Sequence, residues 1–251
     1  MRPIFGPFLS LIFLGSMLGP NLIAQQTPGP QPAPQAGQQT PAGQSKNDQE
    51  LERQKSTGTS NDRLFFTLPN FLTLETKQVP PLTAGQKFKV VARSSFDYVE
   101  YPWYGFLSGV SQAENSEPGF GQGGEGYGKR YAASFADGTI ENFWTGAILP
   151  SLLKQDPRFF ELGQGSFMHR TEYAVSRIFV TRTDSGRSQF NYSEILGSAI
   201  SAGISTYSYH PHDDRTVPNT LSVWGTQVGY DTITIVVKEF WPDIRRKLRG
   251  K

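Results

Sequence analysis

The sequence predicts an all-α fold, a bundle of about five or six helices that follows a disordered N-terminal tether. Apolar residues recur at mostly three- or four-residue steps, the period of a helix, in 129–154 and 219–241. A third helix is expected at 192–209, which begins with a candidate cap and is rich in small residues. Two segments oppose this class, because "RIFVTRT" and "TITIVV" have the β-branched composition of strands. An α+β fold is therefore the alternative.

Residues 1–24 are typical of a signal peptide. Arg2 is their only charge, an apolar stretch runs from Ile4 to Leu18, and Ala24 is a small residue at a position suited to cleavage. An uncleaved membrane anchor is the alternative. The chain has no cysteine, and export without disulfides fits a bacterial envelope. We therefore expect an exported protein of the periplasm or the outer envelope.

Residues 25–60 are expected to be a disordered linker. Gln and Pro dominate their first half, and charged residues dominate the rest. Such a composition has too little apolar surface to offset the entropy of ordering the chain. Residues 61–251 are then expected to form a single helical domain. The net charge of +2 is too small to indicate a nucleic-acid partner.

The glycine-rich run 119–131 contains the spacing G-x-x-x-x-G-K of a phosphate-binding loop, from Gly123 to Lys129. Arg130 follows where such a loop has Ser or Thr, and the preceding residues are polar rather than a buried strand. We expect no nucleotide partner and no cofactor. The run is interpreted as a mobile linker before the helix that starts at 129.

Capping residues and prolines set the expected helix boundaries. Thr83 is expected to cap a helix that runs to about Ser95, and Ser193 to cap the helix at 192–209. Prolines are expected to act in three ways: Pro218 starts the last helix, Pro102 and Pro150 bend or restart theirs, and Pro242 ends 219–241. Residues 169–183 fit either a short helix or a strand.

The stretch "HPHDDR" offers four potential metal ligands: His210, His212, Asp213 and Asp214. Residues two apart share no helical face, and the composition is that of an exposed turn. We therefore assign no metal site.

Three arginines surround Ser185 and Gly186: Arg177, Arg182 and Arg187. Guanidinium groups can bind phosphate or sulfate. The stretch is partly similar to lipid-phosphate phosphatases, but Arg187 stands where their motif has a histidine. No activity is carried over, and a polar loop is the preferred interpretation.

Three carboxylates lie on or near predicted apolar helix faces: Asp137, Glu141 and Asp231. A buried carboxylate is costly unless it is paired. We expect structural ion pairs, with Arg130, Arg177 or Arg182 as the partner of Asp231. A catalytic carboxylate pair is the alternative.

Four segments together resemble a family of uncharacterised exported bacterial proteins: "ILPSLLKQDPRFFELG", "AVSRIFVTRTDSG", "FNYSEILGSA" and "EFWPDIRRKL". The resemblance covers most of residues 125–248. It implies that this region is one unit, and it implies no activity and no site.

The sequence favours a non-enzymatic cell-envelope protein whose helical domain is associated with or embedded in a membrane. Small residues four apart, Gly197 with Ser201 and Ala199 with Gly203, allow close helix packing in lipid. Aromatic residues suit an interfacial belt: Tyr98, Tyr101, Trp103 and Tyr104. The basic ending "DIRRKLRGK" suits a membrane surface or anionic lipid.

The alternative function is a periplasmic hydrolase acting on a phosphorylated or lipid substrate. It would use Arg177 and Arg182 together with His169 or His210. The sequence assigns no catalytic residue, because no spacing of a nucleophile and a base is evident.

Overall fold

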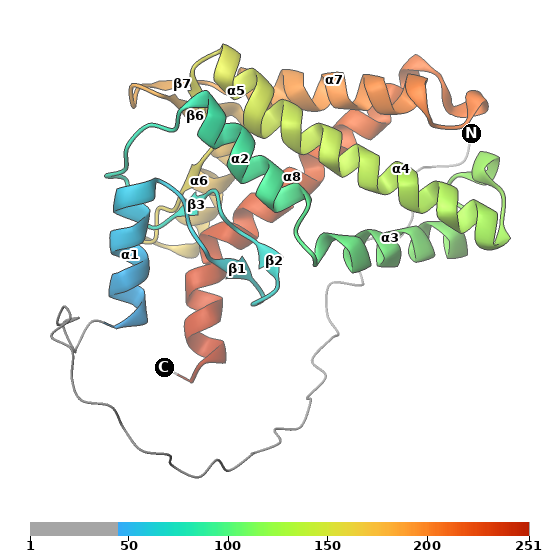
Figure 1. Ribbon diagram of the computed structural model, residues 1–251. Coiled ribbons are helices and arrows are strands. Elements are labelled where there is room, and N and C mark those ends of the chain that lie inside the picture. Colours follow the sequence, from blue (N-terminus) through green and yellow to red (C-terminus); the bar gives the residue numbers. More distant parts are fainter. Residues whose placement is uncertain (1–44, 251) are drawn as a thin grey trace, which may run out of the picture. The chain divides into compact units, whose positions relative to one another are not determined.

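The computed structural model describes residues 45–250 and is predominantly helical, with short strands in small sheets (Figure 1). The helical fold class is therefore confirmed. The predicted signal peptide and residues 25–44 of the predicted linker lie outside the described residues. The first described helix belongs to the same compact unit as the other described residues.

Helix α1 (Lys46–Thr57) forms inside the segment predicted to be disordered, so that prediction is wrong for these residues. Ser45 and Asp48 make a capping box, and Gly58 ends the helix at a φ of 68°, which glycine adopts without strain. Gln54 is buried and accepts a hydrogen bond from the backbone N–H of Glu75 at 3.1 Å. These polar contacts, rather than an apolar face, hold α1 to the domain.

Short strands connect the helices in three small sheets. β1 (Arg63–Leu64) pairs antiparallel with β2 (Leu68–Pro69), and β3 (Thr73–Leu74) pairs parallel with β5 (Phe159–Phe160). The third sheet has the order β4 (Gln155–Asp156), β6 (Val180–Thr183), β7 (Ser188–Phe190) and is antiparallel. "RIFVTRT" thus ends in a strand, whereas "TITIVV" lies in a helix despite its strand composition.

Helix α2 (Ala84–Ser95) confirms the predicted cap at Thr83, which forms a capping box with Gln86. Helix α3 (Glu100–Glu114) begins two residues before Pro102. The first-turn N–H groups of a helix have no intrahelical partner, so a proline there costs no hydrogen bond. The predicted bend at Pro102 is therefore wrong, because the proline sits in a first turn.

Helix α4 (Gly123–Phe143) begins within the glycine run, which corrects the interpretation of this run as a mobile linker. A short 3-10 turn, η2 (Pro118–Phe120), precedes it. Arg130 is fully buried and donates to the carbonyl oxygens of Gly121 at 2.6 Å and Glu117 at 2.7 Å. A Cβ at Gly126 would lie 2.4 Å from the Gly121 oxygen, so glycine there permits a close backbone approach.

The end of the predicted helix 129–154 is interrupted and then restarts. One π-helical turn, η3 (Trp144–Ile148), leads into α5 (Leu149–Leu152), where Pro150 lies in the first turn. The restart expected at Pro150 is therefore confirmed. Gly146 lies in the π turn, where an added Cβ would come within 2.8 Å of Val91 on α2.

Three further helices complete the domain: α6 (Phe167–Phe179), α7 (Tyr192–Ser208) and α8 (Val217–Leu248), with the 3-10 turn η4 (His212–Asp214) before the last. Asn191 caps α7, so the cap predicted at Ser193 is wrong by two residues. Pro218 lies in the first turn of α8 as predicted, but Pro242 lies inside this helix and does not end it.

The basic end of α8 is held against the domain by ion pairs. Arg245 pairs with Asp62 at 2.8 Å and with Glu75 at 3.1 Å, and Asp243 pairs with Arg170 of α6. These contacts hold the helix beyond Pro242, where the sequence predicts a break.

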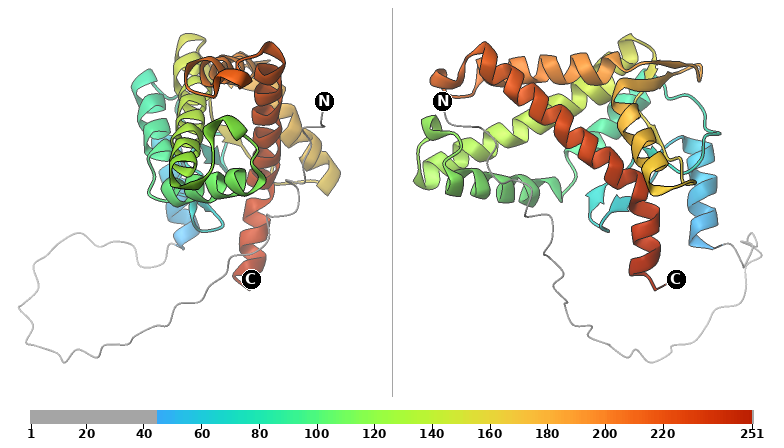
Figure 2. Two further views of the ribbon diagram at one scale, coloured as in Figure 1. Left: turned by 90° about the vertical axis from the view of Figure 1, so that its right-hand side faces the viewer. Right: turned by 180° about the vertical axis from the view of Figure 1, so that it is seen from behind.

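The long helix α7 packs against both α4 and α8 (Figures 1 and 2). Seen from behind, α8 runs diagonally beside α7 and across to α6. No helix within residues 45–250 combines the length and the hydropathy that crossing a membrane requires.

Candidate functional site

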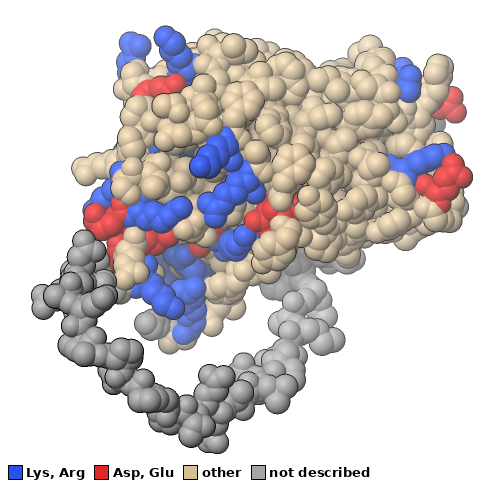
Figure 3. Space-filling model, in the orientation of Figure 1, with Lys and Arg blue, Asp and Glu red and all other residues tan. Residues whose placement is uncertain are grey.

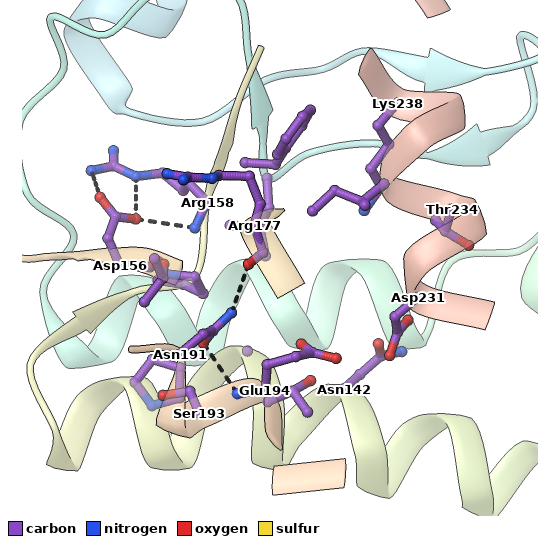
Figure 4. Close-up of a pocket in the computed structure, with 18 of the residues that line it drawn as sticks. Asn142, Asp156, Arg158, Arg177, Asn191, Ser193, Glu194, Asp231, Thr234 and Lys238 are labelled. Atoms are coloured by element: carbon purple, nitrogen blue, oxygen red, sulfur yellow. Dashed lines mark hydrogen bonds and ion pairs between the residues drawn. The ribbon is translucent and has the colours of Figure 1, made fainter. Parts of the chain in front are cut away.

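A polar cavity of about 280 Å³ lies where α4, α7 and α8 meet the sheet of β4 and β6 (Figure 4). Its size is at the lower end of the range for small-molecule sites. Charged side chains from five helices, two strands and the loop after β4 line it: Glu100, Glu141, Asp156, Arg158, Arg177, Arg182, Glu194, Asp231 and Lys238. Such a concentration of charge inside a helical domain is unusual and makes this cavity the candidate site.

The cap of α7 joins two walls of the cavity. Asn191 accepts a hydrogen bond from the backbone N–H of Glu194 at 3.2 Å through Oδ1. Its Nδ2 donates to the backbone carbonyl of Arg177 at 3.1 Å. One side chain thus fixes the start of α7 against the end of α6, and it separates Glu194 from Arg177 in Figure 4.

Ser193 and Gln155 hold the start of α7 against the sheet of β4 and β6. Gln155 is fully buried, accepts hydrogen bonds from the backbone and hydroxyl of Ser193 at 2.9 and 2.7 Å, and donates to Phe190 O at 2.6 Å. Lys87, also buried, donates to the carbonyl of Gln155 at 2.8 Å and pairs with Asp184. These contacts make the sheet side of the cavity rigid.

Four carboxyl groups line the helical side of the cavity: Glu100 from α3, Glu141 from α4, Glu194 from α7 and Asp231 from α8. Burial, then the charges of Asp231 and Asp137, raises the pKa of Glu141 to about 9. Burial and the charge of Asp231 likewise raise the pKa of Glu194. The Oε1 atoms of Glu141 and Glu194 are buried and have no hydrogen-bond partner among the described residues.

Lys238 adds an amino group beside these carboxyls, two turns after Asp231 on α8. Burial lowers the pKa of Lys238, and the charges of Asp231 and Glu194 oppose that shift. Burial raises the pKa of Asp231, while the charge of Lys238 acts in the opposite direction. No described carboxylate comes within 4 Å of the Lys238 amino group. The amino group and the carboxyl groups therefore line the same cavity without forming a close ion pair.

The opposite wall carries arginines. Arg158 and Asp156 form a buried pair at 2.6 Å. The guanidinium of Arg177 lies over the ring of Tyr173, 4.8 Å from its centroid, and that of Arg182 lies 4.3 Å from the centroid of Phe160. Within residues 45–250, neither Arg177 nor Arg182 pairs with a carboxylate.

The predicted arginine partner of Asp231 is therefore wrong. Arg130 binds backbone carbonyls near η2, and the two cavity arginines stack on aromatic rings. The carboxylate does face the interior as expected, but its nearest cation is a lysine of its own helix. The helical period of 219–241 was enough to predict that Asp231 faces the interior. Its partner could not be predicted, because it depends on how α6 and β6 pack within the domain.

Asp137 and Glu141 lie on one helix as predicted but serve two different sites. Asp137 accepts hydrogen bonds from the hydroxyl of Tyr209 at 2.6 Å and from Nε2 of His210 at 3.1 Å. His210 also pairs with Glu117 at 3.0 Å through Nδ1. This buried cluster holds the end of α7 against α4, whereas Glu141 lines the cavity one turn later.

The other predicted candidates do not converge on the cavity. His169 is exposed at the start of α6, and the remaining "HPHDDR" residues lie in the turn η4. Arg187 and Ser185 lie on an exposed hairpin turn. The grouping of His169 or His210 with Arg177 and Arg182 is thus not observed. Among the described residues, no three His, Asp or Glu side chains are arranged to hold a metal ion.

Sequence reasoning missed Glu194 and Lys238. Glu194 is the only charged residue of α7, and Lys238 follows Asp231 by seven residues, on the same face of α8. An isolated charge in a helix otherwise free of charge is the signal that could have identified Glu194.

No family model matches the chain, and comparisons with curated proteins and with solved structures found no similar protein. The resemblance to exported bacterial proteins stays a prediction. The geometry by itself provides hydrogen-bond acceptors and carboxyl groups on one wall, guanidinium groups on the other, and an amino group between the helices. This arrangement can bind a polar molecule, and it holds no histidine that could act as a base.

Proposed function

We propose that this chain is an exported, non-enzymatic protein of the cell envelope whose helical domain associates with a membrane. The observation that carries the proposal is the inward orientation of charge in the three long helices. Asp137 and Glu141 are the only charged residues from Tyr131 to Leu153, and the first bonds His210 while the second lines the cavity.

The same pattern holds in the other two helices. Glu194 is the only charge of α7, and Asp231 is the only charge from Val217 to Val237 of α8. Both carboxyls line the cavity. The outer faces of residues 131–153, 192–208 and 217–237 consequently carry no charged side chain. A water-exposed helix normally has its charges on the outside, so this inverted pattern supports contact with lipid.

Large apolar side chains occupy those outer faces instead. α7 exposes Leu196, Ile200 and Tyr207, and α8 exposes Val217, Leu221, Tyr230 and Ile233. In Figure 3, charged side chains gather near α1, over α2, near the end of α8 and at the tips of the long helices. The surface over the middle of α4 and α7 has none.

Aromatic residues in and just before α3 are also exposed. Tyr98, Tyr101 and Trp103 are at least 42% exposed, whereas Tyr104 is buried against α4 and cannot belong to a lipid-facing belt. Aromatic side chains of this kind favour the headgroup region of a bilayer. The close approach at Gly197 is made to Thr145 of η3, so it serves packing inside the domain.

Flotation of the purified protein with phospholipid vesicles tests the proposal. We expect the wild-type protein to rise with the vesicles in a density gradient. Leu221→Lys should lower the bound fraction by about tenfold, because one buried leucine contributes about 1.5–3 kcal/mol to transfer from water. A wild-type protein that stays at the bottom of the gradient would contradict the proposal.

Leu248→Lys is the matched control. Leu248 lies on the same helix and is 64% exposed, compared with 57% for Leu221, but it lies in the basic end beyond the charge-free face. Its variant should bind vesicles as the wild type does. Equal losses in both variants would mean that the contact is not made by the face proposed here.

A further inference from the structure

The interior cavity holds carboxyl groups on one wall and the guanidinium groups of Arg177 and Arg182 on the other, and no ion pair joins these two walls among the described residues. On the helical wall, Glu141 and Glu194 each have a buried Oε1 atom without a hydrogen-bond partner among residues 45–250. A buried acceptor without a partner is destabilising, so two of them in one cavity indicate space for a molecule that donates hydrogen bonds. An ammonium group offers three such donors.

On the sheet wall, Arg177 and Arg182 present guanidinium groups. Each is stacked on an aromatic ring, which leaves the edge of its plane and its N–H donors available. The one side-chain hydrogen-bond acceptor in the described chain for Arg177 is the hydroxyl of its neighbour Ser176, and for Arg182 there is none. Guanidinium groups bind phosphate with paired, charge-assisted hydrogen bonds.

Asn191 joins the two walls, because its side chain bonds to the backbone of both Arg177 and Glu194 (Figure 4). A molecule that carries both charges a few bonds apart would satisfy both walls at once. The volume of about 280 Å³ suits a metabolite of this size rather than a drug-sized ligand.

We infer that this cavity binds an aminoalkyl phosphate, with its ammonium group among Glu141, Glu194 and Asp231 and its phosphate on Arg177 and Arg182. Phosphate is chosen over carboxylate because a phosphate monoester carries about −1.5 to −2 charges at neutral pH, which two guanidinium groups match. This inference goes beyond the proposed membrane association and does not depend on it, since the cavity residues are distinct from the apolar outer face.

Such chemistry has two sources, a free aminoalkyl phosphate or the headgroup of an ethanolamine phospholipid. Equilibrium dialysis of the full chain with radiolabelled O-phosphoethanolamine tests the shared chemistry. We expect saturable binding of O-phosphoethanolamine, and at least about tenfold weaker binding of ethanolamine, inorganic phosphate and β-alanine. Ethanolamine and inorganic phosphate each lose one charged contact, and β-alanine replaces the phosphate with a carboxylate of lower charge. Equal affinity for inorganic phosphate or for β-alanine would overturn the inference.

Two substitutions test the two walls. Glu194→Gln and Arg182→Gln should each weaken binding by about tenfold or more. Arg187→Gln, on the exposed turn that follows β6, should leave binding unchanged. Unfolding curves check that the variants fold, and Arg182→Lys, which keeps the charge but loses the planar donor edge, replaces Arg182→Gln if that variant does not fold. Unchanged binding in folded variants of both walls would contradict the site.

Competition by vesicles distinguishes the two sources. Displacement of the radiolabelled ligand by vesicles containing phosphatidylethanolamine, but not by phosphatidylcholine vesicles, identifies the lipid headgroup. Displacement by neither identifies a free ligand. Either result supports the site when dialysis finds binding. Failure of dialysis leaves vesicle flotation unaffected, so this inference and the membrane proposal are tested separately.

Discussion

Arg170 of α6 donates from Nε to Oε1 of Glu239 on α8 at 2.8 Å, and the side chain of Glu239 is fully buried. The same carboxylate accepts the backbone N–H groups of Leu162 and Gly163, each at 2.9 Å. Arg170 also lies over the ring of Phe240, 4.5 Å from its centroid. One buried carboxylate thus joins α6, α8 and the loop after β5.

Glu239→Gln is expected to lower the free energy of unfolding by about 3–5 kcal/mol. The amide keeps the shape of the side chain but leaves Arg170 without its buried counter-charge, and it replaces a charged acceptor of two backbone N–H groups. Urea unfolding followed by circular dichroism measures the difference.

Glu52→Gln is the control for this prediction. Glu52 pairs with Lys55 at 2.8 Å on the surface of α1, where its side chain is 62% exposed. The loss should stay below about 1 kcal/mol. Similar small losses in both variants would mean that Glu239 is not sealed from water as the structure indicates.

Glu141→Gln is expected to raise the free energy of unfolding, and only at higher pH. The pKa of Glu141 in the folded protein is raised from 4.5 to about 9, so the folded state holds a proton that the unfolded state releases. The stability of the wild type therefore falls as the pH rises from about 4.5 to about 9. The glutamine variant lacks this loss, and its advantage grows by at most about 1.4 kcal/mol per pH unit.

Unfolding free energies of wild type and Glu141→Gln at pH 4, 6 and 8 check this sign. The two proteins should coincide at pH 4 and diverge above it, with the variant more stable. A variant that is less stable than the wild type at pH 8 would indicate that Glu141 is ionised and paired in the folded state.

The helices of this fold were largely predictable from local signals. Thr83 marks the start of α2, and the three- or four-residue period marks α4 and α8, because both depend on nearby residues alone. The errors arose where tertiary contacts override local composition. Helix α1 is stabilised by polar contacts to distant residues, and α8 continues through Pro242 because ion pairs hold its end.

The site was less predictable than the fold. The sequence identifies Asp231 and Glu141 as interior carboxylates, since each lies on or near an apolar stripe. It does not identify their neighbours, because Glu194, Lys238 and the arginines come together only through the packing of α6, α7 and β6 around the cap at Asn191.

Gly197→Ala and Gly203→Ala should have opposite effects although both glycines lie in α7. A Cβ at Gly197 would stand 3.0–3.2 Å from side-chain and backbone atoms of Thr145, so η3 and α7 would have to separate. We expect a loss of about 1–3 kcal/mol. A Cβ at Gly203 meets nothing within 4 Å, and alanine there should add about 0.5–1 kcal/mol through helix propensity. Thermal unfolding of the two variants measures the loss of stability in the first and the gain in the second.

His210 is expected to remain protonated well above neutral pH. Burial by itself lowers the pKa of this imidazole, but hydrogen bonds to Asp137 and Glu117 more than compensate and raise the pKa from 6.5 to about 10. A raised pKa means that the stability from this cluster is complete below about pH 6.5 and is lost as the pH rises towards 10. Nitrogen chemical shifts of the imidazole in a pH titration by NMR report the value directly.

Asp137→Asn tests the cause of this shift. The variant removes one of the two carboxylates that stabilise the imidazolium, while its amide oxygen can still accept the hydrogen bond from Tyr209. The titration of His210 should move to lower pH, and the decline in stability should begin at lower pH with it. Asp213→Asn, in the exposed turn η4, changes the same charge nearby without touching the cluster and should leave the titration in place. A wild-type His210 that titrates near pH 6.5 would show that the two carboxylates do not hold its proton.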